Sequence, residues 1–342
     1  MHKYHKITKL SPAISTENIG DKIIMEYCDA IFDQLFPDHF SAMLPTRDNL
    51  GKVSRSHIAS ADYSFVCGTN LLSSHMKKYT QWNITPKEIF KIWTSDIGGR
   101  RNLIKRNLLK QHADKNRVIL LGVGWWQYQE DADNYTKRLL NMALSKKYLH
   151  SVRDAYTEQK LRDIGITNVV NTACPTMWNL NWEHCKKIPT AKSNEVITTL
   201  TNYNLSKNED NKLLEILLSN YDRVYVWLQA IEDYQALTES PYFEKINIIS
   251  PTLKAYDDFL DNTDADYIGT RLHGGIRALN KMHRTTILAV DNRAVEIAKD
   301  TNLPVIKRGE VCSKLDGIIN SKFETKIRLP LENIEMWKNQ FT

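Results

Sequence analysis

DYIGTRLHGGIRAL, at residues 266–279, is the stretch of sequence that decides the fold. A strand is predicted at residues 266–269, and a helix opened by a pair of glycines follows it. Arg271 and His273 lie one residue apart just beyond the end of the strand. A strand that leads directly into a helix is the repeating unit of folds built around parallel sheets.

Short apolar runs alternate with amphipathic stretches on both sides of this segment, which predicts an α/β fold. Strands are predicted at residues 6–10, 63–67, 118–123, 148–152, 195–200, 223–228, 245–249, 266–269 and 285–290. Helices are predicted at residues 22–36, 86–109, 131–146, 157–164, 209–219, 232–237, 252–260, 294–301 and 331–340, besides the one that ends at residue 279.

The alternation is interrupted once, between residues 182 and 194, where charged residues, Pro189 and Ser193 replace the periodic apolar pattern. We place an interdomain linker there. The predicted domains are residues 1–185 and 195–330, followed by a C-terminal helix in residues 331–342. We expect two Rossmann-like domains that face each other across a cleft, with ligands bound beyond the carboxyl ends of the strands.

The composition is that of a soluble globular protein, because 42% of the 342 residues are hydrophobic and 25% are charged. The net charge of +6 is mild. Lysine and arginine occur in short, separated pairs rather than on one face, so a nucleic-acid partner is not predicted. A modest basic surplus suits anionic small substrates or an anionic membrane surface.

Cysteine usage and apolar runs indicate the compartment. The five cysteines include no Cys-x-x-Cys pair, which favours a reducing cytoplasm over a disulfide framework. The first ten residues lack the apolar core of a secretory signal, and the longest apolar run, residues 118–126, is too short to span a bilayer. We expect a cytoplasmic protein that is soluble or, at most, peripheral on the cytoplasmic face of the membrane.

Arg271 and His273 carry the strongest chemical signal. Helix N-termini attract anions, and a guanidinium adds a planar fork suited to a carboxylate or phosphate. The imidazole of His273 can give or take a proton near neutral pH. The chemistry alone leaves open a second interpretation, a surface arginine beside a histidine that caps a helix.

The segment Gly269-Thr270-Arg271-Leu272-His273-Gly274 resembles the C-terminal signature of the polysaccharide pyruvyltransferase family. The strand that ends in Val290-Asp291-Asn292-Arg293 is similar to a family strand that often ends in Tyr-Asp-x-Lys, with Arg293 in place of the lysine. Asn18-Ile19-Gly20-Asp21 resembles the family's Asn-x-Gly-Asp turn ahead of the first helix, although Asp21 could also be a simple cap residue.

Four weaker segments follow the family's order. Residues 65–72 resemble a strand that enters a glycine-rich loop, of which Gly68 remains, and residues 122–124 resemble its Gly-x-Gly. Residues 151–157 resemble its Val-Arg-Asp helix start, where Arg153 and Asp154 could also be a structural ion pair. Residues 173–176 are loosely similar to its Asp-Pro-Ala element. Two indoles at a strand end, Trp125 and Trp126, could stack on a sugar or fill the core.

The resemblance implies a glycosyltransferase-B-like fold, phosphoenolpyruvate as donor and a sugar diol as acceptor, either free or carried on a polyprenyl diphosphate. The product would be a pyruvate ketal of a surface or capsular polysaccharide, formed without a metal or a bound cofactor. The catalytic candidates are His273 as proton shuttle, Arg271 as anion clamp and Asp21 on the acceptor side. The substrate-binding candidates are Asn18, Gly20, Gly68, Asn70, Gly124, Trp125, Trp126, Arg153, Thr270, Leu272, Gly274 and Arg293.

Two alternatives remain at this point. A nucleotide-sugar glycosyltransferase could use the same architecture, because a fold does not settle a function. A non-catalytic protein could use Arg271 to hold a sugar or an anion without turnover.

Overall fold

The computed structural model describes residues 4–48, 50–79, 117–201, 204 and 206–342. The chain divides into two compact units, each assembled from separate segments. Unit 1 comprises residues 1–14, 28–172 and 331–342, and unit 2 comprises residues 15–27 and 173–330. The predicted helix at residues 86–109 lies outside the described residues.

Unit 1 contains a parallel sheet in the order β2-β1-β3-β4. Its strands are β1 (His5–Ser11), β2 (His39–Pro45), β3 (Tyr63–Cys67) and β4 (Ile119–Leu121). A parallel bridge between Val123 and Val152 continues it to β5 (His150–Val152), which pairs with β6 (Val169–Asn171). The helices are α2 (Lys52–Ser60), α3 (Met76–Tyr79), α6 (Asn134–Ala143), α7 (Ala155–Asp163) and α15 (Leu331–Asn339).

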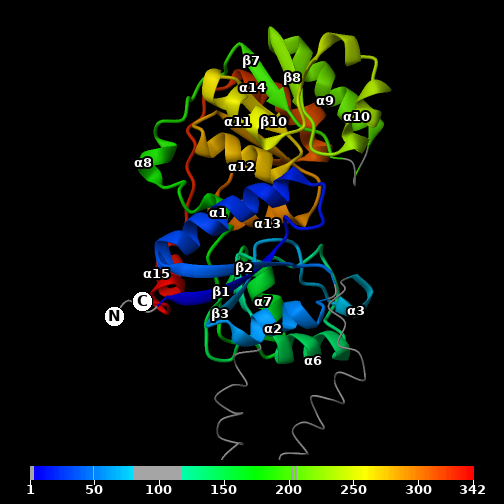
Figure 1. The fold of residues 1–342 in the computed structure, drawn as a ribbon. Helices are drawn as coiled ribbons and strands as arrows, with labels where there is room; N and C mark the ends of the chain where they lie inside the picture. The colour runs from blue at the N-terminus through cyan, green and yellow to red at the C-terminus, as the bar shows by residue number, and fades with distance from the viewer. Residues whose placement is uncertain (1–3, 49, 80–116, 202–203, 205) are drawn as a thin grey trace, which may run out of the picture. The chain divides into compact units, whose positions relative to one another are not determined.

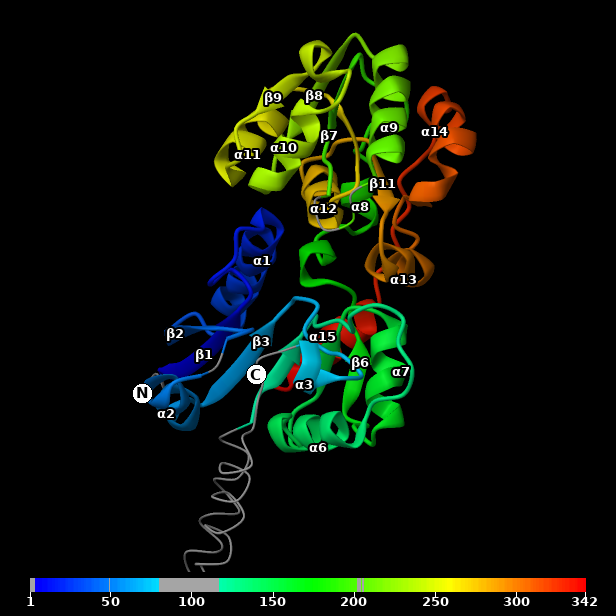
Figure 2. The same cartoon turned by 90° about the vertical axis from the view of Figure 1, so that its right-hand side faces the viewer.

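Unit 2 contains a six-stranded parallel sheet in the order β12-β11-β10-β7-β8-β9, with helices on both faces (Figures 1 and 2). Its strands are β7 (Glu195–Thr198), β8 (Arg223–Trp227), β9 (Asn247–Ile249), β10 (Asp266–Gly269), β11 (Thr285–Ala289) and β12 (Val305–Lys307). Its helices are α8 (Trp182–Cys185), α9 (Lys207–Asn220), α10 (Ile231–Thr238), α11 (Leu253–Asn262), α12 (Leu272–Asn280), α13 (Asn292–Thr301) and α14 (Val311–Asn320).

The strand order of unit 2 reverses direction between β7 and β10. From β7 the chain proceeds to β8 and β9 on one side of the sheet, and from β10 to β11 and β12 on the other. Loops beyond the carboxyl ends of two such strands diverge and leave a crevice in which α/β proteins bind ligands. β10, the strand that leads into Arg271 and His273, is therefore one of the two strands at this reversal.

Alternating side chains of the unit 2 strands build two apolar cores. Ile197, Tyr267 and Ile287 belong to one cluster, with residues of α1, α11 and α12. Val196 and Ile268, their sequence neighbours, belong to the other, with residues of α9 and α14. Successive side chains of a strand point to opposite faces, so a strand between two layers of helices is apolar on both sides.

Helix α1 (Ile19–Leu35) is shared by the two units, because residues 15–27 group with unit 2 and residue 28 onward with unit 1. Ile19 and Ile23 lie in an apolar cluster with Leu272 of α12. In unit 2, Arg277 of α12 also forms a two-contact ion pair with Asp257, at 2.8 and 2.7 Å, and lies 3.3 Å from Glu26. These contacts fix the first half of α1 to unit 2.

In unit 1, an aromatic cluster packs around the C-terminal residues of the chain. The ring of Phe341 lies within 5.7 Å, centroid to centroid, of Phe36, Tyr63 and Phe65. The adjacent Trp337 of α15 is fully buried. Residues 331–342, predicted to stand apart as a C-terminal helix, are thus part of the core of unit 1.

These units differ from the predicted boundary near residue 185, since residues 15–27 and 173–185 group with unit 2. The difference arises because residues far apart in the sequence pack together, as Ile19 and Cys185 do in one apolar cluster. Among the described residues, no helix combines the length and apolar character needed to cross a membrane. Within the described ranges, the sequence did not predict three strands and four helices, namely β2, β6, β12, α2, α3, α8 and α14.

Candidate active site at the carboxyl edge of the unit 2 sheet

Arg271 forms a buried ion pair with Asp233, a residue of α10. Its Nη2 donates to both carboxylate oxygens, at 2.8 and 2.7 Å, and its Nε donates to the Leu200 carbonyl oxygen at 2.8 Å. The two side chains are 5% and 1% exposed. From the sequence we expected the guanidinium of Arg271 to be open to a ligand. In the structure, two of its nitrogens instead donate to Asp233 and to the Leu200 carbonyl oxygen beyond the end of β7.

Asp233 is held in place by the first turn of its own helix. Its Oδ2 accepts hydrogen bonds from the backbone N–H groups of Gln229 and Ala230, at 3.1 and 3.2 Å. A carboxylate near a helix N-terminus is stabilised by these N–H groups and by the helix dipole. Arg271 is consequently aimed by a partner that is itself rigidly placed.

His273 lies in the first turn of α12 and is 8% exposed. Its Nε2 is 3.8 Å from the sulfur of Cys174, which accepts a hydrogen bond from Thr176 Oγ1 at 3.1 Å. Cys174 follows Ala173, a residue with a φ of 59°. The segment loosely similar to the Asp-Pro-Ala element is therefore next to the imidazole, a proximity that the sequence did not predict.

The turn at residues 18–21 belongs to unit 2, whereas the sequence predicted that Asp21 lies in the first domain. Asn18 caps α1, because its Oδ1 accepts from the Gly20 N–H at 3.1 Å. Asp21 is 4% exposed and accepts from Thr16 Oγ1 at 2.9 Å. A Cβ at Gly20 would lie 3.7 Å from Oε1 of Gln229, which follows β8. The turn thus lies at the same sheet edge as Arg271.

Three other candidates beside Arg271 have structural contacts. Thr270 Oγ1 donates to the Thr199 carbonyl oxygen at 2.9 Å and joins the ends of β10 and β7. Leu272 belongs to the apolar cluster below α12. A Cβ at Gly274 would lie 3.1 Å from the Tyr267 hydroxyl, closer than most such contacts. Burial raises the pKa of Tyr267, whose neutral hydroxyl donates to the Arg271 carbonyl oxygen at 2.7 Å.

The candidates of unit 1 also come together, at the ends of β3, β4 and β5. Arg153 Nη2 donates to Asn70 Oδ1 at 2.7 Å, and Arg153 Nε donates to Asp154 at 3.1 Å. Gly68 has a φ of 52°, in the left-handed region that glycine adopts readily. The backbone of Gly124 lies against the guanidinium of Arg153. The Arg153–Asp154 ion pair is buried, which agrees with the alternative that these two residues form a structural ion pair.

Trp125 and Trp126 have different environments. The ring of Trp125 is fully buried in the apolar core of unit 1, and its Nε1 donates to Gln129 Oε1 at 3.1 Å. A sugar-stacking role for Trp125 is therefore wrong, because no face of its indole reaches solvent. Trp126 is half-buried.

Gly124→Ala is expected to destabilise unit 1 by about 1–3 kcal/mol, because its Cβ would overlap the Arg153 guanidinium, which two partners hold in place. Chemical denaturation of both forms measures the free energy of unfolding. Gly317→Ala is the matched control. Nothing lies within 4 Å of a Cβ at Gly317, inside helix α14, so this change should stabilise by about 1 kcal/mol. Equal effects of the two substitutions would contradict the prediction.

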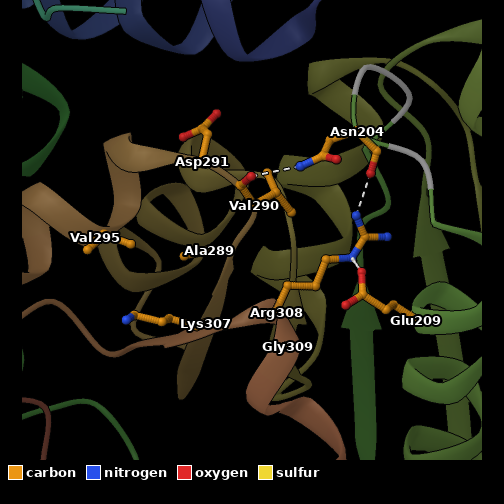
Figure 3. A pocket seen from close by; sticks show the side chains of 9 residues that line it. All are labelled: Asn204, Glu209, Ala289, Val290, Asp291, Val295, Lys307, Arg308 and Gly309. Atoms are coloured by element: carbon orange, nitrogen blue, oxygen red, sulfur yellow. Dashed lines mark hydrogen bonds and ion pairs between the residues drawn. The ribbon is translucent and has the colours of Figure 1, made fainter. Parts of the chain in front are cut away.

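Arg293 lies beside Asp291 at the start of α13. Its Nε donates to Asp291 Oδ2 at 2.9 Å, and Asp291 caps the helix through the Arg293 N–H at 3.0 Å. Asp291 lines a pocket of about 320 Å³ beyond the ends of β11 and β12 (Figure 3). Arg308 lines it too and is paired with Glu209 at 3.1 Å. Arg293 is not among the residues that line this pocket.

Gln229, Asp233 and Cys174 are residues of this sheet edge that the sequence reading missed. The sequence did contain a signal for Gln229, because this residue directly follows the predicted strand at residues 223–228 and ligands bind beyond the carboxyl ends of strands. Asp233 fell inside a predicted helix, and nothing in its spacing from Arg271 indicated the ion pair.

A family model described as polysaccharide pyruvyl transferase matches residues 18–292. The match covers most of the chain and includes every candidate residue except Arg293. The chain belongs to the polysaccharide pyruvyl transferase family. No curated protein matches the sequence.

A solved structure with a TM-score above 0.5 confirms the predicted glycosyltransferase-B-like α/β fold. UDP-GlcNAc 2-epimerase of Methanocaldococcus jannaschii, in complex with UDP-GlcNAc and UDP, is 11% identical, with a TM-score of 0.52 over 99% of this chain and 98% of that one. MnaA of S. aureus, in a co-structure with UDP, is 12% identical, with a TM-score of 0.47 over 94% of this chain and 92% of that one. At these identities the likeness concerns the fold alone.

Proposed function

We propose that this protein transfers the pyruvyl group of phosphoenolpyruvate to two hydroxyls of a sugar and forms a pyruvate ketal. The observation that carries the proposal is the position of His273. It lies in the first turn of α12, two residues beyond Arg271, at the strand reversal of a chain that belongs to the polysaccharide pyruvyl transferase family. A proton donor beside an anion-attracting helix end is what this chemistry requires.

The reaction begins with protonation of the donor's methylene carbon, which gives a methyl group and an oxocarbenium-like central carbon. One sugar hydroxyl attacks that carbon and releases its proton to the base left by the first step. The carbon–oxygen bond to phosphate then breaks, and a second hydroxyl attacks and closes the ring. Its proton leaves with the phosphate, so one donor and one diol give one ketal and inorganic phosphate.

In this scheme His273 donates the first proton and recovers one from the attacking hydroxyl. Arg271 supplies positive charge on the donor side, in an orientation fixed by Asp233. Asp21, held by Thr16, orients a hydroxyl of the acceptor. The charge that develops at the central carbon and on phosphate is best stabilised by groups that are already oriented.

Phosphoenolpyruvate labelled with ¹³C in the pyruvyl group tests the proposal. Wild-type protein is incubated with the donor and a panel of sugar acceptors, both free and attached to polyprenyl diphosphate, and the products are measured by mass spectrometry and NMR. Labelled ketal supports the proposal. Sugar transfer from a nucleotide donor without ketal would support the glycosyltransferase alternative, and binding without product would support the non-catalytic one.

Trp126→Ala is expected to raise KM for the acceptor by about three- to tenfold while leaving folding nearly unchanged, because an indole face can stack on a sugar ring. Steady-state kinetics with varied acceptor measures the effect. Trp182→Ala is the control, since that indole is 57% exposed on α8 of unit 2. An unchanged acceptor KM in Trp126→Ala would remove this residue from the acceptor site.

A further inference from the structure

Gln229 carries a buried amide group that the structure leaves unsatisfied. The residue is 2% exposed, and its Nε2 has no hydrogen-bond partner among the described residues. An unsatisfied buried donor costs about 1–3 kcal/mol of stability, so such groups are rare in folded proteins. An amide that persists in this state is a candidate for contact with a ligand.

The amide of Gln229 lies between the first turns of two helices. Its Nε2 is 3.3 Å from the position of a Cβ at Gly274 in α12, and its Oε1 is 3.7 Å from that of a Cβ at Gly20 in α1. Both neighbours are glycines, so no side chain of either separates the amide from the backbone of the two helix ends. N–H groups in the first turn of a helix have no acceptor within the helix and attract anions. In α1 the N–H of Gly20 already donates to Asn18 Oδ1, so α1 contributes mainly through its dipole.

The main chain of Gln229 is tied to the ion pair of Asp233 and Arg271. Its N–H donates to Asp233 Oδ2 at 3.1 Å, and the same carboxylate binds Arg271. Asp233 and Arg271 form a buried ion pair. The amide therefore contributes a neutral donor at a defined place, next to the two helix ends and beside Gly274, the residue that follows His273.

We propose that Gln229 is a ligand-binding residue whose Nε2 donates a hydrogen bond to an oxyanion of the donor substrate, held between the N-termini of α1 and α12. The oxyanion is a phosphate or carboxylate oxygen. The identity of the donor rests on the proposed function, whereas the binding of an oxyanion by Gln229 does not.

Binding measured without turnover tests this role. Isothermal titration calorimetry, with no acceptor present, gives affinities of the wild type for phosphoenolpyruvate, inorganic phosphate and pyruvate. Gln229→Met keeps the length of the side chain and removes the donor, and we expect it to weaken phosphoenolpyruvate binding about tenfold or more, as for loss of a hydrogen bond to a charged group. Gln229→Glu places a negative charge there and should weaken binding further. Loss of phosphate affinity alone assigns the phosphate, and loss of pyruvate affinity alone assigns the carboxylate.

Thermal unfolding of the ligand-free variants separates binding from structure. Because Gln229→Met removes an unsatisfied donor, its melting temperature should be equal to or above that of the wild type. Gln235→Met, at an exposed position of α10, is the matched control and should change neither quantity. A lowered melting temperature together with unchanged affinity for all three ligands would show that Gln229 is structural and overturn the proposal.

The remaining outcomes distinguish this inference from the proposed function. If the wild type makes ketal and both Gln229 variants keep the wild-type affinities and donor KM, the inference fails and the function stands. If the wild type makes no ketal but Gln229→Met weakens phosphate or pyruvate binding, the function fails and the oxyanion site stands. Absence of wild-type binding to all three ligands at millimolar concentration overturns the inference.

Discussion

His273→Gln is expected to lower turnover by about a hundredfold or more, the usual range for loss of a general acid or base. The glutamine cannot supply a proton to the methylene carbon of the donor. Folding should be nearly unchanged, because Gln replaces the imidazole by a polar side chain of similar reach at the first turn of α12. Steady-state kinetics measures turnover, and thermal unfolding measures stability.

Deuterium incorporation identifies the step that His273 performs. In D₂O the wild type should place one deuterium in the ketal methyl group, and His273→Gln should do so at a correspondingly slower rate. His184→Gln is the control, because that ring lies in the same unit and binds the Leu279 carbonyl oxygen at 2.8 Å. Near-normal turnover of His273→Gln would show that the residue contacts ligand without acting as the acid.

Asp233→Ala is expected to destabilise the protein by about 3–5 kcal/mol, because it leaves the guanidinium of Arg271 buried without its counter-charge. Arg271→Lys keeps the charge but loses the planar fork, and it should weaken phosphoenolpyruvate binding substantially. Urea denaturation measures the first effect, and calorimetric titration of the donor measures the second.

A control variant and two contrary outcomes test these roles of Asp233 and Arg271. Asp258→Ala breaks an exposed ion pair, in which the side chains of Asp258 and Lys254 are 57% and 81% exposed. It should leave the free energy of unfolding nearly unchanged. Wild-type donor affinity in Arg271→Lys would confine Arg271 to a structural role, even if Asp233→Ala unfolds as expected. Wild-type stability of Asp233→Ala would show that the buried pair contributes little.

Local sequence patterns predicted five of the six strands of the unit 2 sheet, all except β12. β8 and β11 are short apolar runs between amphipathic stretches, and their alternating side chains face two different cores. The weak point was β2, an edge strand in which Phe40 and Met43 are 67% and 46% exposed. A strand whose side chains are largely exposed has no need of a continuous apolar run, so its pattern was hard to detect.

The candidate site was predictable only in part, since the sequence shows which residues follow a strand but not what they contact. Arg271 and His273 were found at the end of β10. The pairing of Arg271 with Asp233 joins residues 38 positions apart, and that of His273 with Cys174 joins residues 99 positions apart. Such contacts depend on strand order, which local periodicity does not contain. The same reason explains why Asn18 to Asp21 were placed in the wrong domain.

The division of each unit among separate segments has a consequence for biosynthesis. All residues of unit 2 are synthesised before residues 331–342 of unit 1. Until Trp337 and Phe341 are made, the rings of Phe36 and Phe65 have no cover from them. The unit that contains the first residues of the chain is therefore the unit completed last, and apolar rings left uncovered during synthesis make an incompletely folded chain prone to aggregation.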